Sequence, residues 1–78
     1  MVELVRFIAQ SLVEHPEAVE VREVENADSI VIELRVAEGD MGKVIGKQGR
    51  IAKSIRTVVK AAAAKENKHI HYSVDIVE

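Results

Sequence analysis

The sequence predicts an α+β fold with the element order αββααβ, in which helices cover one face of a three-stranded mixed sheet. Two observations support this prediction. Hydrophobic residues recur at helical spacing near the N-terminus and again in the stretch that follows residue 50. Three other segments alternate apolar and polar residues, as strands with one buried face do. The chain has 78 residues, which is room for a single domain over residues 1–78 with one core.

The first helix is expected over residues 2–14. Apolar residues recur at helical spacing from Leu4 to Leu12, and Pro16 ends the pattern because the residue before a proline disfavours helical geometry. This helix is expected to pack on the sheet.

A hairpin is expected next. Its first strand, over residues 19–25, has an alternation that slips near Glu23, whereas residues 30–36 alternate regularly. Residues 26–28, Asn-Ala-Asp, are typical of the turn between two such strands. The chain must then cross over to a third strand, and the right-handed rule for crossovers makes that strand parallel to the second if the two are neighbours.

Two more helices and a last strand make up the second half. Residues 38–40 end the second strand, and residues 41–45 suffice for only a short helix. A long helix is expected from residue 49 or 50 to about residue 65. The last strand is expected from His69 to Val77, and its core-facing residues are Ile70, Tyr72, Val74 and Ile76.

The long helix has two opposite faces, since each residue turns the helix by about 100°. Its apolar face comprises Ile51, Ile55, Val58, Val59 and Ala62. The opposite face carries a basic stripe, which consists of Arg50, Lys53, Arg56 and Lys60. No acid occurs between Met41 and Lys65. A face that is merely solvated usually mixes the signs of its charges, so the stripe indicates an electrostatic role.

The net charge of −2 hides a strong polarisation along the chain. Residues 1–40 hold ten acids and three arginines, a balance of −7, whereas residues 41–68 hold eight bases and one acid, a balance of +7. Nucleic-acid-binding domains are usually basic overall, but a basic pole is sufficient to attract an anionic partner.

The positive half contains two glycines three residues apart, Gly46 and Gly49, which enclose Lys47 and Gln48. Glycines let the main chain turn sharply and leave its N–H groups accessible, and the helix that follows adds its own unpaired N–H groups. The segment therefore predicts a clamp for nucleic-acid phosphates. A simple turn with a glycine C-cap is the alternative, but two glycines around two polar residues exceed what a cap requires.

Enzymatic and stacking functions are not predicted. A nucleotide-hydrolysing P-loop needs a glycine five residues before its Gly-Lys pair and a Ser or Thr after it, and Met41 and Gln48 hold those places. An RRM-like stacking surface needs exposed aromatic residues, and the two present, Phe7 and Tyr72, are both assigned to the core. We expect no enzyme activity and no cofactor.

No metal site is expected. His69 and His71 share a strand face, but His15 is the remaining histidine and the chain has no cysteine. The sequence also lacks an apolar run of the ~20 residues that a membrane helix needs, and its N-terminus lacks the layout of a signal peptide. A cytoplasmic protein is expected, since a chain without cysteine fits a reducing compartment.

The run from Val44 to Ile51, in this order of elements, resembles the bacterial K-homology (KH) RNA-binding domain of type II. The whole chain resembles the small one-domain members of that family, the RNA chaperones of KhpA type. KH domains clamp about four nucleotides with a GXXG loop. The resemblance therefore implies a type II KH fold and binding of single-stranded RNA.

The resemblance also implies roles for individual residues. Gly46 and Gly49 set the loop, Lys47 and Gln48 lie at its tip against the phosphates, and Arg50 begins the next helix beside them. The apolar positions of the groove floor and core match Ile45, Ile51 and Ile55. Residues 65–68 match the variable loop, and the last strand forms the other wall of the groove. The implied RNA-binding residues are Ile45, Gly46, Lys47, Gln48, Gly49, Arg50 and Lys53.

Two kinds of protein partner are implied in the same way. Members of the family self-associate, which implies a homodimer, and pair with a larger RNA-binding protein that carries a second KH domain. An alternative function stays open: a protein-interaction module that keeps the KH fold and uses the apolar faces of its helices. Val2, Val13 and Val59 lie toward the edges of those faces, where partial exposure is expected.

Overall fold

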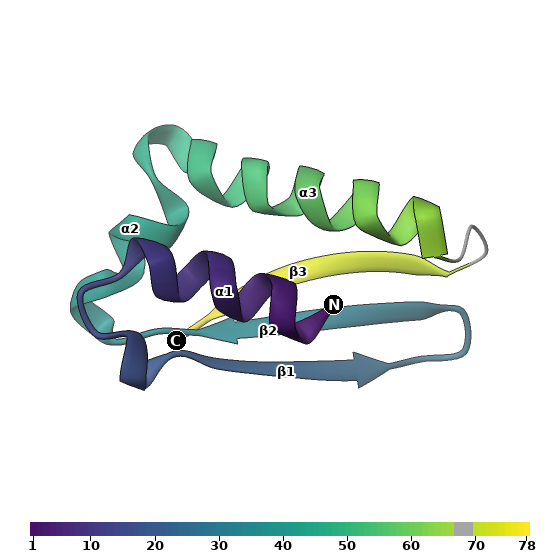
Figure 1. The fold of residues 1–78 in the computed structure, drawn as a ribbon, viewed down its shortest axis with the longest axis horizontal. Coiled ribbons are helices and arrows are strands. Elements are labelled where there is room, and N and C mark those ends of the chain that lie inside the picture. The colour runs from purple at the N-terminus through teal and green to yellow at the C-terminus, as the bar shows by residue number, and fades with distance from the viewer. Residues whose placement is uncertain (67–69) are drawn as a thin grey trace.

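The protein is described by a computed structural model that covers residues 1–66 and 70–78. Its helices and strands follow the predicted order (Figure 1) and are α1 (Val2–Leu12), β1 (Glu20–Glu25), β2 (Ser29–Arg35), α2 (Met41–Ile45), α3 (Arg50–Glu66) and β3 (His71–Val77). Single turns of 3-10 helix occur at Pro16–Ala18, Glu38–Asp40 and Lys47–Gly49. The variable loop predicted at residues 65–68 is wrong at Lys65 and Glu66, which continue α3, and the strand predicted from His69 begins only at His71 among the described residues. Asn67, Lys68 and His69 lie outside those residues.

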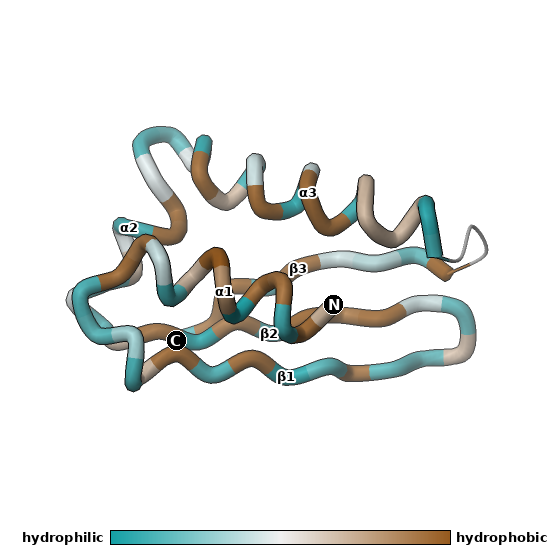
Figure 2. Tube along the Cα trace, viewed as in Figure 1, coloured by the Kyte–Doolittle hydropathy of each residue, from teal (hydrophilic) through white to brown (hydrophobic). Residues whose placement is uncertain are grey.

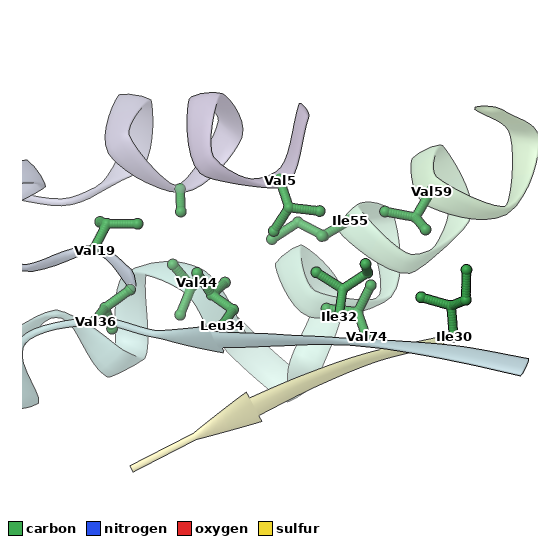
Figure 3. Packing of buried hydrophobic residues seen from close by; sticks show 11 residues of the cluster. Val5, Val19, Ile30, Ile32, Leu34, Val36, Val44, Ile55, Val59 and Val74 are labelled. Carbon is green, nitrogen blue, oxygen red and sulfur yellow. The ribbon is translucent and has the colours of Figure 1, made fainter. Parts of the chain in front are cut away.

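The three strands form one sheet in the order β1-β2-β3. β1 pairs with β2 antiparallel, and β2 pairs with β3 parallel, so the sheet is mixed as predicted. Figure 3 shows α1 and α3 on the same side of this sheet, with the buried side chains between the two layers. The predicted α+β architecture, a three-stranded mixed sheet with helices on one face, is therefore confirmed.

The core lies between the helices and the covered face of the sheet (Figure 3). Alternation along the central strand β2 buries Ile30, Ile32 and Leu34. Val36, one residue beyond the strand, continues the same pattern and is also buried. The helices contribute buried side chains from Val5, Ala9, Val44, Ile55 and Val59. Val74 of β3 is buried with them, and Ile70, Tyr72 and Ile76 pack partly buried against the same cluster, as predicted for the last strand.

Helix α1 is shorter than the predicted range of 2–14. Val13 leaves helical geometry with φ −95° and ψ 161°. The next two main-chain N–H groups, of Glu14 and His15, donate to the carboxylate of Asp40 at 3.2 and 3.0 Å. The helix ends at this point because the buried Asp40 carboxylate takes two N–H groups that would otherwise donate to the carbonyls of Gln10 and Ser11 in a further turn.

Three assignments of residues to helix faces were wrong. Phe7 is 70% exposed, because it lies about 200° around α1 from the fully buried Val5. Val58 is 43% exposed, because it lies about 100° from Val59, and Val59 itself is fully buried rather than at an exposed edge. Alanines complete the buried face of α3 in place of Val58, at Ala52 and Ala63.

Strand β1 is the most hydrophilic of the three strands, as Figure 2 shows. Its alternation slips at the predicted place: Val21 pairs with Leu34 on the covered face, whereas Val24 pairs with Val31 on the opposite face. Glu23 therefore points to the helix side, where it is exposed. This position at the edge of the sheet tolerates a charge because no helix covers it fully.

Candidate nucleic-acid interface

The two predicted glycines build a tight loop between α2 and α3, which projects at the upper left of Figure 1. Helix α2 ends where the Gly46 N–H donates to the Gly42 carbonyl at 2.8 Å. Gly46 then adopts φ 78° and ψ 175°, a region open essentially to glycine alone. Gly49 also has a positive φ, of 74°, and its N–H donates to the Gly46 carbonyl at 3.1 Å. The loop is thus closed by its own turn.

The tip of this loop presents two main-chain donors. Gln48 is held in left-handed geometry, with φ 57° and ψ 25°, although it is not a glycine. The Gly49 N–H donates within the loop, and the Arg50 N–H donates to the Lys47 carbonyl. Within residues 1–66 and 70–78, no acceptor takes the N–H groups of Lys47 and Gln48. These two amides, and not those of the glycines, are available to a ligand.

Positive side chains surround the tip without acidic partners. Lys47, Arg50 and Lys53 are exposed, and no ion pair involves them in the described part of the chain. The Nη2 atom of Arg50 donates to Oε1 of Gln48 at 3.4 Å, which holds the guanidinium over the loop. Lys43 contributes little, since its Nζ atom lies 3.6 Å from Glu14 and 3.9 Å from Asp40.

One residue of the basic stripe reaches the sheet. The Nε atom of Arg56 donates to the main-chain carbonyl of Val74 on β3 at 3.1 Å. Lys60 stays exposed one turn further along α3. The stripe therefore borders the β3 flank of the sheet.

The three isoleucines of the predicted groove differ in exposure. Ile45, the last residue of α2, is 36% exposed beside the loop. Ile51 is half-buried against the core, and Ile55 is buried within it. Ile45 is therefore the member of this set that offers apolar surface next to the loop, whereas Ile55 serves the core.

Asp40 is a site residue that the sequence did not indicate. Asp40 directly precedes α2 and is 1% exposed. Its carboxylate accepts hydrogen bonds from the N–H groups of Glu14 and His15, which follow α1. Burial raises the pKa of Asp40, but the hydrogen bonds from Glu14 and His15, together with the charges of His15 and Lys43, lower the pKa below its ordinary value of 3.8. Asp40 thereby ties the base of α2 to the end of α1 and positions the loop.

No sequence pattern marks this role, because the hydrogen-bonding partners of Asp40 lie 25 and 26 positions away. Of the predicted RNA-binding residues, the structure brings together the loop, the first turn of α3 and the end of α2. Two of the three histidines of the imagined metal site are described: His15 faces Glu17 at 3.6 Å, and His71 is exposed on β3. The described ranges contain no cluster of three or more metal-ligating side chains, and none of their helices has the length and apolar character to cross a bilayer.

Known proteins resemble this chain along nearly its whole length. The model of the family described as "KhpA/KhpB, KH domain" matches residues 2–76. A protein of Clostridium perfringens named RNA-binding protein KhpA is 67% identical over 70 residues, which are 90% of this chain and 93% of that protein. A Chlamydia trachomatis protein of the same name is 42% identical over 78 residues, which are 100% of this chain and 97% of that protein.

Solved structures resemble the fold as well. A crystal structure of Aquifex aeolicus Era bound to GDP·AlF4− superimposes with a TM-score of 0.66 at 26% identity. The match covers 97% of this chain but 30% of the Era chain, so the similarity concerns one part of that larger protein. A second Era structure, which contains nucleotides 1506–1542 of 16S ribosomal RNA, gives a TM-score of 0.58 with the same coverage.

Proposed function

The chain belongs to the KhpA/KhpB KH-domain family, and from this premise we propose that it binds single-stranded RNA through the loop between α2 and α3. The family is defined by a KH domain and not by a reaction, which confirms the expectation that the protein is not an enzyme. Relatives with the printed name RNA-binding protein KhpA support the ligand. The balance of +7 over residues 41–68 supports the attraction to an anionic strand.

The main support for RNA binding at this loop is the pair of main-chain N–H groups at Lys47 and Gln48, which have no acceptor within the described residues. An N–H group that hydrogen-bonds a charged oxygen contributes about 1.5–3 kcal/mol, more than a neutral pair does. The two amides donate to the oxygens of one phosphate, and the side chains of Lys47 and Arg50 add charge on either side. Lys53 extends the positive surface to the next phosphate.

Ile45 supplies the apolar part of the contact. Its side chain is 36% exposed at the end of α2, directly before the loop. A base whose phosphate sits on the loop tip covers this side chain, and covering apolar surface is favourable by about 25 cal/mol per Å². The contact favours a nucleotide over an anion that carries no base, without selecting one base.

Binding through so few contacts is modest in strength, which suits an RNA chaperone that holds many transcripts loosely in the cytoplasm. A homodimer, or a complex with a larger RNA-binding protein that carries a second KH domain, raises the strength because the second contact becomes intramolecular. These partners follow from the family resemblance and remain predictions.

The test places negative charge at the loop tip. The double variant Lys47→Asp/Gln48→Asp keeps both glycines and the core but repels phosphate, so its affinity for unstructured RNA is expected to fall roughly tenfold or more. The matched control is Gln10→Asp/Arg35→Asp, which makes the same change in net charge at exposed positions of α1 and β2. Fluorescence anisotropy measures both, and circular dichroism verifies that both are folded.

The control is expected to bind RNA within about threefold of the natural chain, since its charges lie away from the loop and are screened by salt. Equal affinity of the folded loop variant and the natural chain would contradict the proposed clamp. Equal losses in both variants would show that overall charge, and not the loop, holds the RNA.

We propose self-association through apolar helix surface as a second function. Phe7 and Val58 are 70% and 43% exposed, and Leu12 is 38% exposed at the end of α1. Salt separates the two functions, because RNA binding weakens as salt rises whereas apolar association does not. Sedimentation of the RNA-free protein at low and high salt measures self-association. A protein that stays monomeric at every concentration would contradict this second function.

A further inference from the structure

Arg56 differs from the other residues of the basic stripe in the direction that its side chain takes. Measured around α3 from Arg50, Lys53 and Lys60 lie at about −60° and −80°, whereas Arg56 lies at about −120°, nearer to the buried face. Its side chain bends toward the sheet and donates from Nε to the Val74 carbonyl at 3.1 Å. The guanidinium is therefore held on the flank between α3 and β3.

The hydrogen bond with Val74 leaves most of the guanidinium unused. An arginine has five N–H donors in a rigid plane, and the Nε donor that meets Val74 is one of them. No carboxylate pairs with Arg56 among residues 1–66 and 70–78, and the residue is exposed. The terminal nitrogens Nη1 and Nη2 thus form a fork that has no partner in this part of the chain.

The position of the fork favours a base over a phosphate. Arg56 begins about 9 Å along α3 from Arg50, since six residues rise by about 1.5 Å each. A strand whose backbone lies on the loop and on Lys53 directs its bases either to solvent or to the β3 flank. A base on that flank meets the fork of Arg56, whereas the outward stripe residues Lys53 and Lys60 meet the backbone.

We infer that Arg56 is a specificity-determining residue that recognises guanine in the bound strand, an inference that rests on the proposed function. A rigid pair of N–H donors matches two adjacent acceptors on one base edge, and the O6 and N7 atoms of guanine form such a pair. Adenine presents the N6 amino donor beside N7, so one N–H of the fork meets an acceptor and the other faces a donor. The Val74 carbonyl keeps the fork oriented.

The experiment measures the affinity of the full chain for three short RNA strands. Each strand is built of A and U and differs from the others at one position, which holds guanine, adenine or 7-deazaguanine. The natural chain is expected to prefer guanine over adenine by about tenfold, near the lower end of the range for a bidentate contact. 7-Deazaguanine lacks the N7 acceptor, so most of the preference is expected to disappear. This comparison needs no change in the protein.

Two variants separate recognition from charge. Arg56→Lys keeps the charge but lacks the planar fork, so the preference for guanine is expected to fall to about onefold to twofold while the affinity for the adenine strand stays within about threefold. Lys60→Gln removes a charge from the same stripe and is expected to weaken all strands by the same factor. Unfolding midpoints confirm that both variants are folded.

The outcomes distinguish this inference from its premise. Equal affinity of the natural chain for all three strands, or an equal loss for all three in Arg56→Lys, would overturn the role of Arg56 and leave RNA binding by the loop intact. Absence of binding to every strand would overturn the proposed function itself, and the inference with it.

Discussion

Ile51 lies directly against Gly46: a Cβ atom at Gly46 would stand 2.6 Å from Cγ1 of Ile51 and 2.9 Å from its main-chain nitrogen. Such contacts are too close for any side chain, and Gly46 also has a φ of 78°. We predict that Gly46→Ala destabilises the protein by more than about 2 kcal/mol, because a steric clash adds to the strain of this backbone region. Urea unfolding measures the loss.

Gly49 offers the matched comparison. Its φ of 74° is also positive, but a Cβ atom there would meet nothing within 4 Å. Gly49→Ala is therefore expected to cost about 1 kcal/mol, the strain of left-handed geometry alone. If the Gly49 variant proves the less stable of the two, contact with Ile51 does not set the requirement for glycine at position 46.

The salt dependence of RNA binding reports how many phosphates the protein neutralises. Contacts at Lys47, Arg50 and Lys53, with Lys60 further along α3, correspond to about three or four phosphates, which gives a log–log slope of about −2 to −3 on a single strand. Anisotropy titrations between about 50 and 200 mM salt measure the slope. A slope steeper than about −4 would mean that the whole length of α3 follows the RNA backbone.

The low pKa of Asp40 makes part of the stability depend on pH. Because the folded state lowers this pKa below 3.8, the carboxylate stabilises the fold at all pH values above 3.8, and this contribution is lost as the pH falls through the folded-state pKa. We predict that Asp40→Asn has a lower thermal midpoint than the natural chain at neutral pH. The difference is expected to shrink below pH 3.8. Thermal unfolding followed by circular dichroism over that range provides the measurement, and a gap that stays constant or widens in acid would contradict the role of Asp40.

Two neighbouring residues of α1 test the revised packing. Val5 is fully buried and Phe7 is 70% exposed. We expect Val5→Ala to destabilise the fold by about 2 kcal/mol through lost burial and a cavity. In dilute solution, where the chain is monomeric, Phe7→Ala is expected to change stability by less than about 0.5 kcal/mol, as exposed positions do. Chemical unfolding of both variants measures the contrast, and a large loss for Phe7→Ala in dilute solution would contradict the exposed position of that ring.

The fold was predictable where one physical rule determined each element. Alternation on β2 predicts Ile32 and Leu34 as core residues because a strand covered on one face has a period of two. The crossover rule predicts the parallel pairing of β2 and β3, which the register confirms. The spacing of Gly46 and Gly49 predicts a tight loop, and both have a positive φ.

The rest required contacts between distant residues, which no local pattern contains. Asp40 is an ordinary acid in the sequence, and its importance comes from the loop after α1 that folds against it. Arg56 belongs to a regular basic stripe, and its bond to Val74 depends on how closely α3 packs on β3. The wrong prediction for Phe7 had a different cause. The residue was assigned to the core because it is apolar, although its angle on α1 already placed it away from the core.

The sheet ends in two unlike borders. β1 at one border exposes Glu20, Glu23 and Glu25, whereas β3 at the other is flanked by the guanidinium of Arg56. An unpaired strand is a template on which further strands add and aggregates grow, and a row of like charges discourages that addition. The glutamates of β1, whose cationic neighbour Arg22 is paired with Glu33, therefore oppose the addition of a second β1 strand at this border.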